Sequence, residues 1–254
     1  MGTTPAEPRT TTPRTPLTRD RVLEAASDLA DREGLDGLTM RALADDLGVE
    51  AMSIYYHLPN KDAILDGVVE LTFTEVGAET ADAASTGSGG TDAAGWAASV
   101  RERILGARRV LLRHPWAPVI IDRRKSFSPA MVRHVDGIVG VMRDAGMSHD
   151  LIHHSLHAIG NRIYGYVQEL SDDGEAPPPG QLDQMRSFAP HLADMLAEVA
   201  HVDPDSTLGW CDDQTEFEFG LDLLLEGIER RRAAEAAAGP PRPGRRAPGA
   251  TTRT

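Results

Sequence analysis

Residues 39–61, TMRALADDLGVEAMSIYYHLPNK, decide how the rest of the chain is interpreted. Leu43 and Leu47 lie one helical turn apart and predict a short helix that ends at Gly48, whose missing side chain permits a tight turn. A second short helix follows and ends before Pro59. Two short helices joined by a glycine turn form a helix-turn-helix, the unit that places one helix in the major groove of DNA.

The second short helix combines buried positions with unusual exposed ones. We expect Ile54 to pack against the preceding helices, as Val49 does just before it. These apolar residues, with Leu43 and Leu47, are core residues in any helical fold, so spacing alone leaves both DNA binding and plain packing open. An ordinary surface helix has little use for adjacent tyrosines and a histidine. The side chains expected to keep exposed edges are Ala51, Met52, Ser53, Tyr55, Tyr56 and His57.

Outward from this motif the apolar period is helical almost throughout. Thr18 is a plausible N-cap for a first helix that ends at Gly34, and Asn60 caps a fourth helix. Strand-like alternation never lasts beyond about four residues, so the predicted fold class is all-α. Further helices are predicted at 95–113, 128–145, 149–171, 181–200 and 212–232.

Composition excludes several classes of protein. The chain has 254 residues, of which 41 % are hydrophobic, so it can form a sizeable core. Cys211 is the single cysteine, which excludes an intrachain disulfide and a cysteine-cluster zinc site. We expect a cytoplasmic protein with no membrane partner, because no apolar run reaches the length of a membrane span and the N-terminus lacks a secretory signal.

The charge balance restricts how the chain could bind DNA. A net charge of −13 argues against sequence-blind binding to nucleic acid, although a few well-placed cations can act locally. Residues 17–67 hold five basic and eleven acidic side chains, so we expect the acids to face away from the duplex. The cations left to form a DNA face are Arg19, Arg21, Arg41 and Lys61.

Longer patterns extend this reading. The chain carries G-L-D-G-L-T at 34–39, L-A-x-x-L-G-V at 43–49 and Y-Y-H-L-x-N-K at 55–61. This stretch resembles the TetR family of bacterial transcriptional repressors, and the tetracycline-repressor branch is the most similar. Residues 160–165 and 217–229 resemble the two dimerising helices of that branch, so the resemblance spans residues 17–231.

The resemblance implies an N-terminal three-helix helix-turn-helix domain, joined by a long helix to a C-terminal helical bundle for ligand binding and dimerisation. Both ends of the chain are compositionally biased, and we predict them to be disordered. The predicted boundaries are an N-terminal tail at 1–16, the DNA-binding domain at 17–77 with its motif at 39–58, a linker at 78–95, the ligand-binding and dimerisation domain at 96–232, and an Arg/Pro/Ala-rich tail at 233–254.

The resemblance also assigns DNA contacts. Arg41 matches an arginine that reads a guanine, a pairing worth about 1–3 kcal/mol, and Lys61 would hold a phosphate. Ala51 and Met52 replace a polar reader and a proline and can offer only apolar contact, so the operator should differ from that of the tetracycline repressors. The other predicted contacts, to phosphates, sugars and base edges, come from Ser53, Tyr55, Tyr56 and His57.

An effector pocket is implied inside the C-terminal bundle. Asp122 stands about where the tetracycline repressors have a magnesium-binding histidine, so magnesium–tetracycline is not the expected ligand, and no cofactor is predicted. The residue types favour an apolar small molecule, aromatic ones included. The candidate ligand-binding residues are Arg103, Ala107, Trp116, Asp122, Asn161, Tyr164 and Glu169.

Histidines at positions 149, 153 and 157 recur every four residues, beside His154. That spacing can bind zinc or nickel, but no H-E-x-x-H pattern accompanies it, so we read a polar stripe and assign no metal ligand and no catalytic residue.

The sequence thus predicts a homodimeric repressor, not an enzyme, that binds a palindromic DNA operator and is released by a small-molecule effector. The alternatives are a helical metal-dependent enzyme that uses the His149–His157 stripe, and a DNA-binding activator without an inducer.

Overall fold

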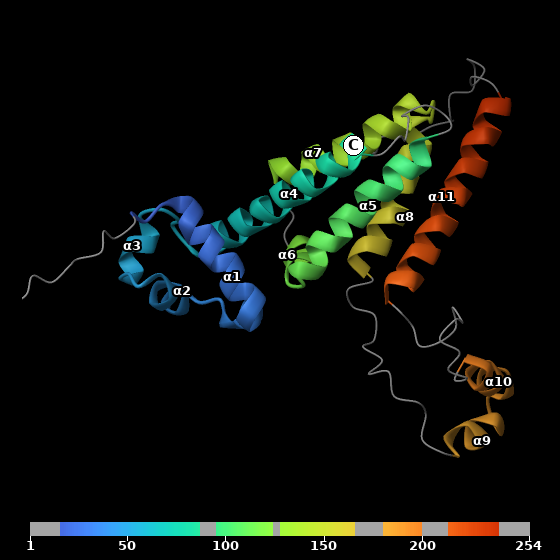
Figure 1. The fold of residues 1–254 in the computed structure, drawn as a ribbon, viewed down its shortest axis with the longest axis horizontal. Coiled ribbons are helices and arrows are strands. Elements are labelled where there is room, and N and C mark those ends of the chain that lie inside the picture. Colours follow the sequence, from blue (N-terminus) through green and yellow to red (C-terminus); the bar gives the residue numbers. More distant parts are fainter. Residues whose placement is uncertain (1–15, 87–94, 124–127, 166–179, 200–212, 239–254) are drawn as a thin grey trace, which may run out of the picture. The chain divides into compact units, whose positions relative to one another are not determined.

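The computed structural model describes residues 16–86, 95–123, 128–165, 180–199 and 213–238, and every regular element in these ranges is a helix (Figure 1). The predicted all-α fold class is therefore confirmed. The described helices form two compact units, the first comprising the chain up to Thr74 together with Arg113–Met131, and the second the remainder. Among the described residues, none of these helices is both long and apolar enough to cross a membrane.

The first unit begins with α1 (Arg19–Gly37), α2 (Met40–Leu47) and α3 (Ala51–Tyr55), drawn in blue in Figure 1. The Thr18 hydroxyl accepts a hydrogen bond from the Arg21 amide at 3.2 Å, and Thr39 caps α2 in the same way. The predicted cap at Thr18 is confirmed. Gly34, with φ of 71°, breaks the regular geometry of α1 where the sequence predicts its end.

The turn between α2 and α3 depends on Gly48. Its φ of 64° and ψ of 38° lie in the left-handed region, which a residue with a Cβ rarely adopts. The amide of Gly48 donates to the carbonyl of Asp45 at 3.2 Å, and that of Val49 to the carbonyl of Ala44 at 3.0 Å. These bonds end α2 and fix where α3 starts.

Helix α4 (Lys61–Thr86) starts at the predicted cap, since the Asn60 side chain accepts from the Ala63 amide at 2.8 Å. A Cβ on Gly67 would lie 2.4 Å from Leu23, so this glycine permits a close approach of α4 to α1. The prediction of a linker from residue 78 is wrong for 78–86, because alanine-rich sequence continues the helix there. The buried core of this unit includes Val22, Leu29, Leu43, Ile54, Ile64 and Val68.

Helix α5 (Trp96–Arg113) ends just before the predicted stop at His114, and a short α6 (Ala117–Arg123) that the sequence did not predict follows. The Trp116 indole donates to the carboxylate of Asp31 in α1 at 2.5 Å, and His114 Nδ1 lies 2.9 Å from the same carboxylate. Trp116 is buried, as expected of a packed indole. These contacts hold the start of α6 against α1 within the first unit.

The second unit contains α8 (His149–Gly165) and α11 (Asp213–Ala238), which pack against each other. Trp96 of α5 donates to Glu229 of α11 at 2.8 Å, and Arg101 pairs with Glu218 at 2.6 Å. Hydrogen bonds from Gln214 and Arg101 lower the pKa of the Glu218 carboxyl. Polar contacts therefore hold α11 along α5.

Two predicted helix boundaries change, and a third cannot be compared with the structure. The predicted helix 181–200 is two helices, α9 (Gln181–Arg186) and α10 (Pro190–Val199), because Pro190 has no amide to continue the first. Helix α11 runs to Ala238, so residues 233–238 are helical, contrary to the predicted disordered tail. Residues 166–171 of the predicted helix 149–171 lie outside the described residues, and α7 (Pro129–Asp144) matches its prediction closely.

Candidate functional site

Helix α3 buries one side and exposes the other. Ile54 has no exposed surface and Leu58 just 3 %, so these two side chains anchor α3 on the first unit. Met52 is 67 % exposed and Tyr56 86 %, and both belong to the five-residue helix or its C-terminal cap. Large apolar and aromatic side chains are rarely left in water without a binding role when several occur together. The predicted exposure of Met52, Tyr55, Tyr56 and His57 is confirmed, whereas Ala51 and Ser53 are half-buried.

The two cations expected to hold DNA are also exposed. Arg41 lies in the first turn of α2, where its guanidinium is free to reach beyond the helix. Lys61 opens α4, and its ammonium group donates to the Leu35 carbonyl at 3.4 Å. An amine at a helix N-terminus beside exposed backbone amides can share an anionic oxygen with them. Both side chains therefore have the chemistry of phosphate and base contact.

Part of the acidic excess of the first unit is engaged elsewhere. Asp46 pairs with Arg32 at 2.7 Å, and Asp31 accepts from Trp116 and His114. Each pair directs a carboxylate toward a protein partner instead of toward a ligand. That the acids face away from the duplex stays a prediction, with which the protein partners of Asp31 and Asp46 are compatible.

The ligand-binding candidates divide between the units. Trp116 and Asp122 belong to the first unit, where Trp116 is committed to Asp31 and Asp122 is exposed near the end of α6. Glu169 lies outside the described residues. The remaining candidates belong to the second unit, and they are Arg103, Ala107, Asn161 and Tyr164.

In the second unit these candidates differ in burial. Ala107 is buried on α5, and Arg103 is half-buried, with its guanidinium donating to the Ser99 carbonyl at 3.1 Å. Burial raises the pKa of Tyr164 to about 12, so this phenol is a hydrogen-bonding group and not a titrating one near neutral pH. Asn161 is exposed on α8. Arg103 and Tyr164 are the candidates whose polar groups lie partly inside the bundle.

His134 of α7 is a polar residue that the sequence analysis did not single out. Burial, with the nearby charge of Arg103, lowers its pKa to about 4, so the imidazole is neutral at pH 7. The sequence holds a signal for it, because the residues four positions to either side, Ala130 and Ile138, are apolar, and the structure buries both. A histidine in the middle of an apolar helix face is worth noting for that reason.

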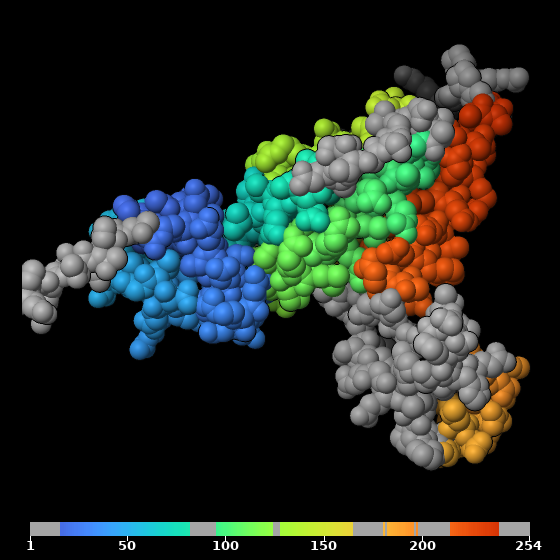
Figure 2. Space-filling model, viewed as in Figure 1, coloured from blue at the N-terminus to red at the C-terminus, as the bar shows by residue number. Residues whose placement is uncertain are grey.

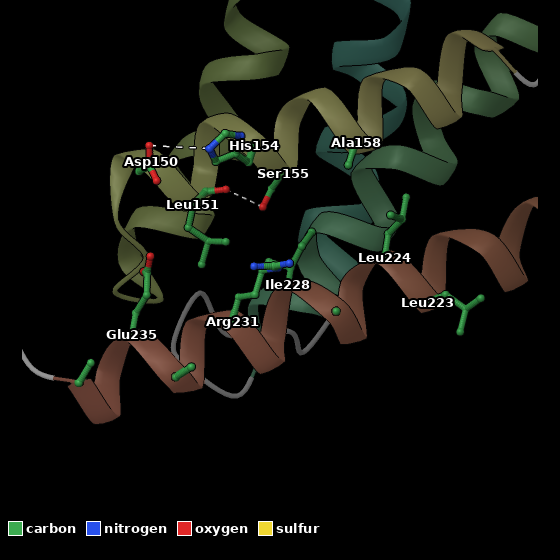
Figure 3. A pocket seen from close by; sticks show the side chains of 13 residues that line it. Asp150, Leu151, His154, Ser155, Ala158, Leu223, Leu224, Ile228, Arg231 and Glu235 are labelled. Atoms are coloured by element: carbon green, nitrogen blue, oxygen red, sulfur yellow. Dashed lines mark hydrogen bonds and ion pairs between the residues drawn. The ribbon is translucent and has the colours of Figure 1, made fainter.

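A groove of about 740 Å³ runs between α8 and α11 (Figure 3). Its lining is largely apolar, and its charged side chains, Asp150, Arg231 and Glu235, lie toward one end, as Figure 3 shows. The Ser148 hydroxyl donates to Glu235 at 2.7 Å, which ties the two helices together at one end. The lining residues include Leu151, Ala158, Leu223, Leu224, Gly227 and Ile228.

Helix α11, orange to red in Figure 2, also exposes apolar side chains, one of which, Leu223, lines the groove. Phe219 and Leu223 are 63 % and 51 % exposed, whereas Leu221 between them is fully buried. Exposed apolar side chains beside an apolar groove are typical of a protein–protein contact.

The enzyme alternative requires a metal centre with three protein ligands. Within the described part of the chain, no group of three or more histidine, cysteine, aspartate or glutamate side chains could hold a metal ion. The stripe at 149–157 therefore provides no such centre among these residues.

Two family models match the chain. The model described as "Bacterial regulatory proteins, tetR family" matches residues 22–68, and the model described as "Tetracyclin repressor-like, C-terminal domain" matches residues 89–232. Together they account for the helix-turn-helix and for the second unit with its α8–α11 pair. The resemblance drawn from the sequence is confirmed.

Individual relatives of the chain point to the same family. Tetracycline repressor protein class D of Escherichia coli is 36 % identical over 215 residues, which cover 84 % of this chain and 89 % of that protein. The HTH-type transcriptional repressor DrrR1 of Streptomyces coeruleorubidus is 29 % identical over 225 residues, covering 85 % and 79 %. The crystal structure of the Streptomyces coelicolor TetR family protein ActR in complex with actinorhodin aligns with a TM-score of 0.63 at 25 % identity, covering 89 % of this chain and 100 % of that one.

Proposed function

The chain belongs to the TetR family of bacterial regulatory proteins, and we propose that it is a homodimeric transcriptional repressor that leaves its operator when a small-molecule effector binds. The observation that carries this proposal is the surface of α3, where Met52 and Tyr56 are exposed beside the anchored Ile54. The proposed repressor acts in the cytoplasm, where it binds double-stranded DNA.

On the operator, α3 enters the major groove. Arg41 reads a guanine, and Lys61 holds a phosphate at the N-terminus of α4. The tyrosines and His57 contact the sugar-phosphate backbone and base edges. Ala51 and Met52 contribute apolar contact, for which the methyl group of thymine is the natural partner. A site with a guanine and a neighbouring thymine in each half is the expected target.

Dimerisation uses the groove between α8 and α11 together with the exposed face of α11. Helix α11 is held along α5 by Trp96 and Arg101, which leaves Phe219 and Leu223 for a second copy. Two copies related by a twofold axis present two α3 helices to half-sites about 34 Å apart on the duplex. A palindromic operator follows from that symmetry.

The effector binds within the second unit. Its ligand contacts include Arg103, Asn161 and Tyr164, with His134 as a further neutral hydrogen-bonding group. These polar groups on an apolar bundle suit a ligand with an apolar body and a few polar substituents. Ligand binding lowers operator affinity by its preference for the DNA-free conformation, and each tenfold loss requires about 1.4 kcal/mol of that preference.

The experiment is a fluorescence-anisotropy titration of labelled upstream intergenic DNA, with and without candidate apolar ligands. We expect wild-type protein to bind tightly and to be released by one ligand. Tyr164→Phe and Asn161→Ala should weaken release while leaving affinity for the operator nearly unchanged. If both variants lose operator affinity as much as they lose release, these residues support the fold and the assignment of the pocket fails.

A further inference from the structure

Two histidines of α8 lie one helical turn apart with their rings in contact. The ring centroids of His153 and His157 are 4.7 Å apart, and the rings meet nearly edge to face, at 84°. Both side chains are exposed, and neither lines the groove between α8 and α11. The repressor function proposed above assigns no role to these two histidines.

The separation of the two rings matches that of two imidazoles on one metal ion. A metal–nitrogen bond of about 2.0–2.1 Å places the ion about 3.2 Å from each ring centroid. Two such rings at a bond angle between 90° and 109° then have centroids about 4.5–5.2 Å apart. The observed 4.7 Å falls within that interval, but the rings now meet edge to face, so their nitrogens do not yet aim at one point. Rotation of the two exposed side chains about their χ angles is needed to turn one nitrogen of each toward a shared ion, and their spacing of four residues on one helix face allows this without backbone movement.

The neighbouring histidine has a different partner. His154 Nε2 lies 3.8 Å from the carboxylate of Asp150, and both of these residues line the groove, as Figure 3 shows. The His154 ring is 5.7 Å from that of His153, farther than the His153–His157 pair. These contacts single out His153 and His157 from the four histidines of the stripe.

We propose that His153 and His157 form a two-ligand site for a borderline transition-metal cation, with water completing the coordination. Imidazole nitrogens favour copper(II), nickel(II) and zinc(II) over magnesium or calcium, and affinity should rise from nickel to copper. Both rings are neutral when the ion binds, so the site requires no buried charge. Its ligands lie on α8 and not on α2 or α3, so the metal ion and the DNA do not compete for the same residues.

The test is isothermal titration calorimetry of the chelator-treated full chain with nickel(II) chloride. Wild-type protein should bind one ion per chain at this site, and His153→Ala or His157→Ala should each weaken binding at least about tenfold. His149→Ala is the matched control, since it removes a histidine of the same stripe and should change affinity less than about twofold. Circular dichroism without metal checks that every variant retains its helices.

Copper(II) electron paramagnetic resonance gives a second readout, with hyperfine structure from two imidazole nitrogens in wild type and from at most one in either variant. The proposal is overturned if His149→Ala weakens binding as much as His157→Ala, because the ion is then not held by His153 and His157 alone. It is also overturned if the double variant His153→Ala/His157→Ala binds nickel as wild type does. Operator titration of the same variants reports on the repressor function separately.

Discussion

The first and second units present their functional side chains in opposite ways. At α3, Met52 and Tyr56, which are proposed to contact DNA, are among the most exposed large apolar or aromatic side chains of the described residues, as Tyr56 shows at 86 %. In the helical bundle the polar groups proposed to meet an effector, Arg103 and His134, are half-buried within an apolar core. A surface that binds a large rigid duplex must project, whereas a site for a small ligand must enclose.

This difference decides what each unit tolerates. Exposed residues of α3 contribute little to folding, so substitutions there should change DNA binding alone. Residues of the bundle serve packing and function together, and the effect of a substitution depends on which side of a helix it occupies. The predictions below use that contrast, from the largest expected effect to the smallest.

The largest contrast lies within α11. Leu221 is fully buried and Leu223 is 51 % exposed, although the two are only two residues apart. Leu221→Glu leaves an unpaired carboxylate in the core and should lower the free energy of unfolding by about 3–5 kcal/mol. Leu223→Glu should leave the monomer folded and disrupt the dimer. Urea denaturation and analytical ultracentrifugation measure the two effects, and equal destabilisation by both variants would refute the assigned faces of α11.

His134 should make the stability of the second unit depend on pH. Its pKa is about 4 when folded, against 6.5 for the unfolded chain, so the unfolded state binds more protons between these values. Stability is therefore fully present above pH 6.5 and falls as the pH drops toward 4, with a loss of about 2 kcal/mol between pH 7 and pH 5.

His134→Leu is the comparison for this effect, because it keeps an apolar helix face and removes the titrating group. Urea denaturation at the two pH values should show a smaller decrease for the variant by about that amount. If wild type and variant lose the same stability, His134 is not held neutral by burial.

Arg41→Ala should weaken specific operator binding by about 1–3 kcal/mol and relax the preference at one base pair of each half-site. Because Arg41 is exposed, the melting temperature should hardly change. Competition titrations against operators with single base changes give the measurement. A uniform loss over all sequences would make Arg41 a phosphate contact instead.

Lys61→Ala is expected to have the smallest effect. Its loss should weaken binding to every sequence alike and reduce the slope of log affinity against log salt by about one for each protomer. Anisotropy titrations at several salt concentrations measure the slope. An unchanged slope would mean that Lys61 does not contact a phosphate and that its ammonium group only donates to the Leu35 carbonyl.

The fold of the first unit was predictable because its signals are local. Thr18, Asn60 and Gly48 act within four residues of their own positions, and the structure has each of them in its predicted role. Helix α6 was missed because its first five residues are all apolar and show no helical period, and its start is held by the distant contact between Trp116 and Asp31.

The two candidate sites were predictable to different degrees. Exposure of Tyr55 and Tyr56 followed from the spacing around Ile54, whereas the burial of His134 and its proximity to Arg103 of α5 depend on tertiary structure. Trp116 and Asp122 belong to the first unit and Arg103 to the second. This separation is likewise a property of the tertiary structure, and the spacing of these residues in the sequence does not reveal it. Local geometry is therefore readable from the chain, and the composition of a pocket is not.

The central claim is that two copies of α3 read a palindrome in successive major grooves. Hydroxyl-radical footprinting of the upstream intergenic DNA with wild-type protein tests it most directly. The account predicts two protected half-sites with inverted sequence, centred about one helical turn apart, both lost when Leu223→Glu separates the copies. Protection of a single site by that variant as well as by wild type, or uniform protection without half-sites, would contradict it.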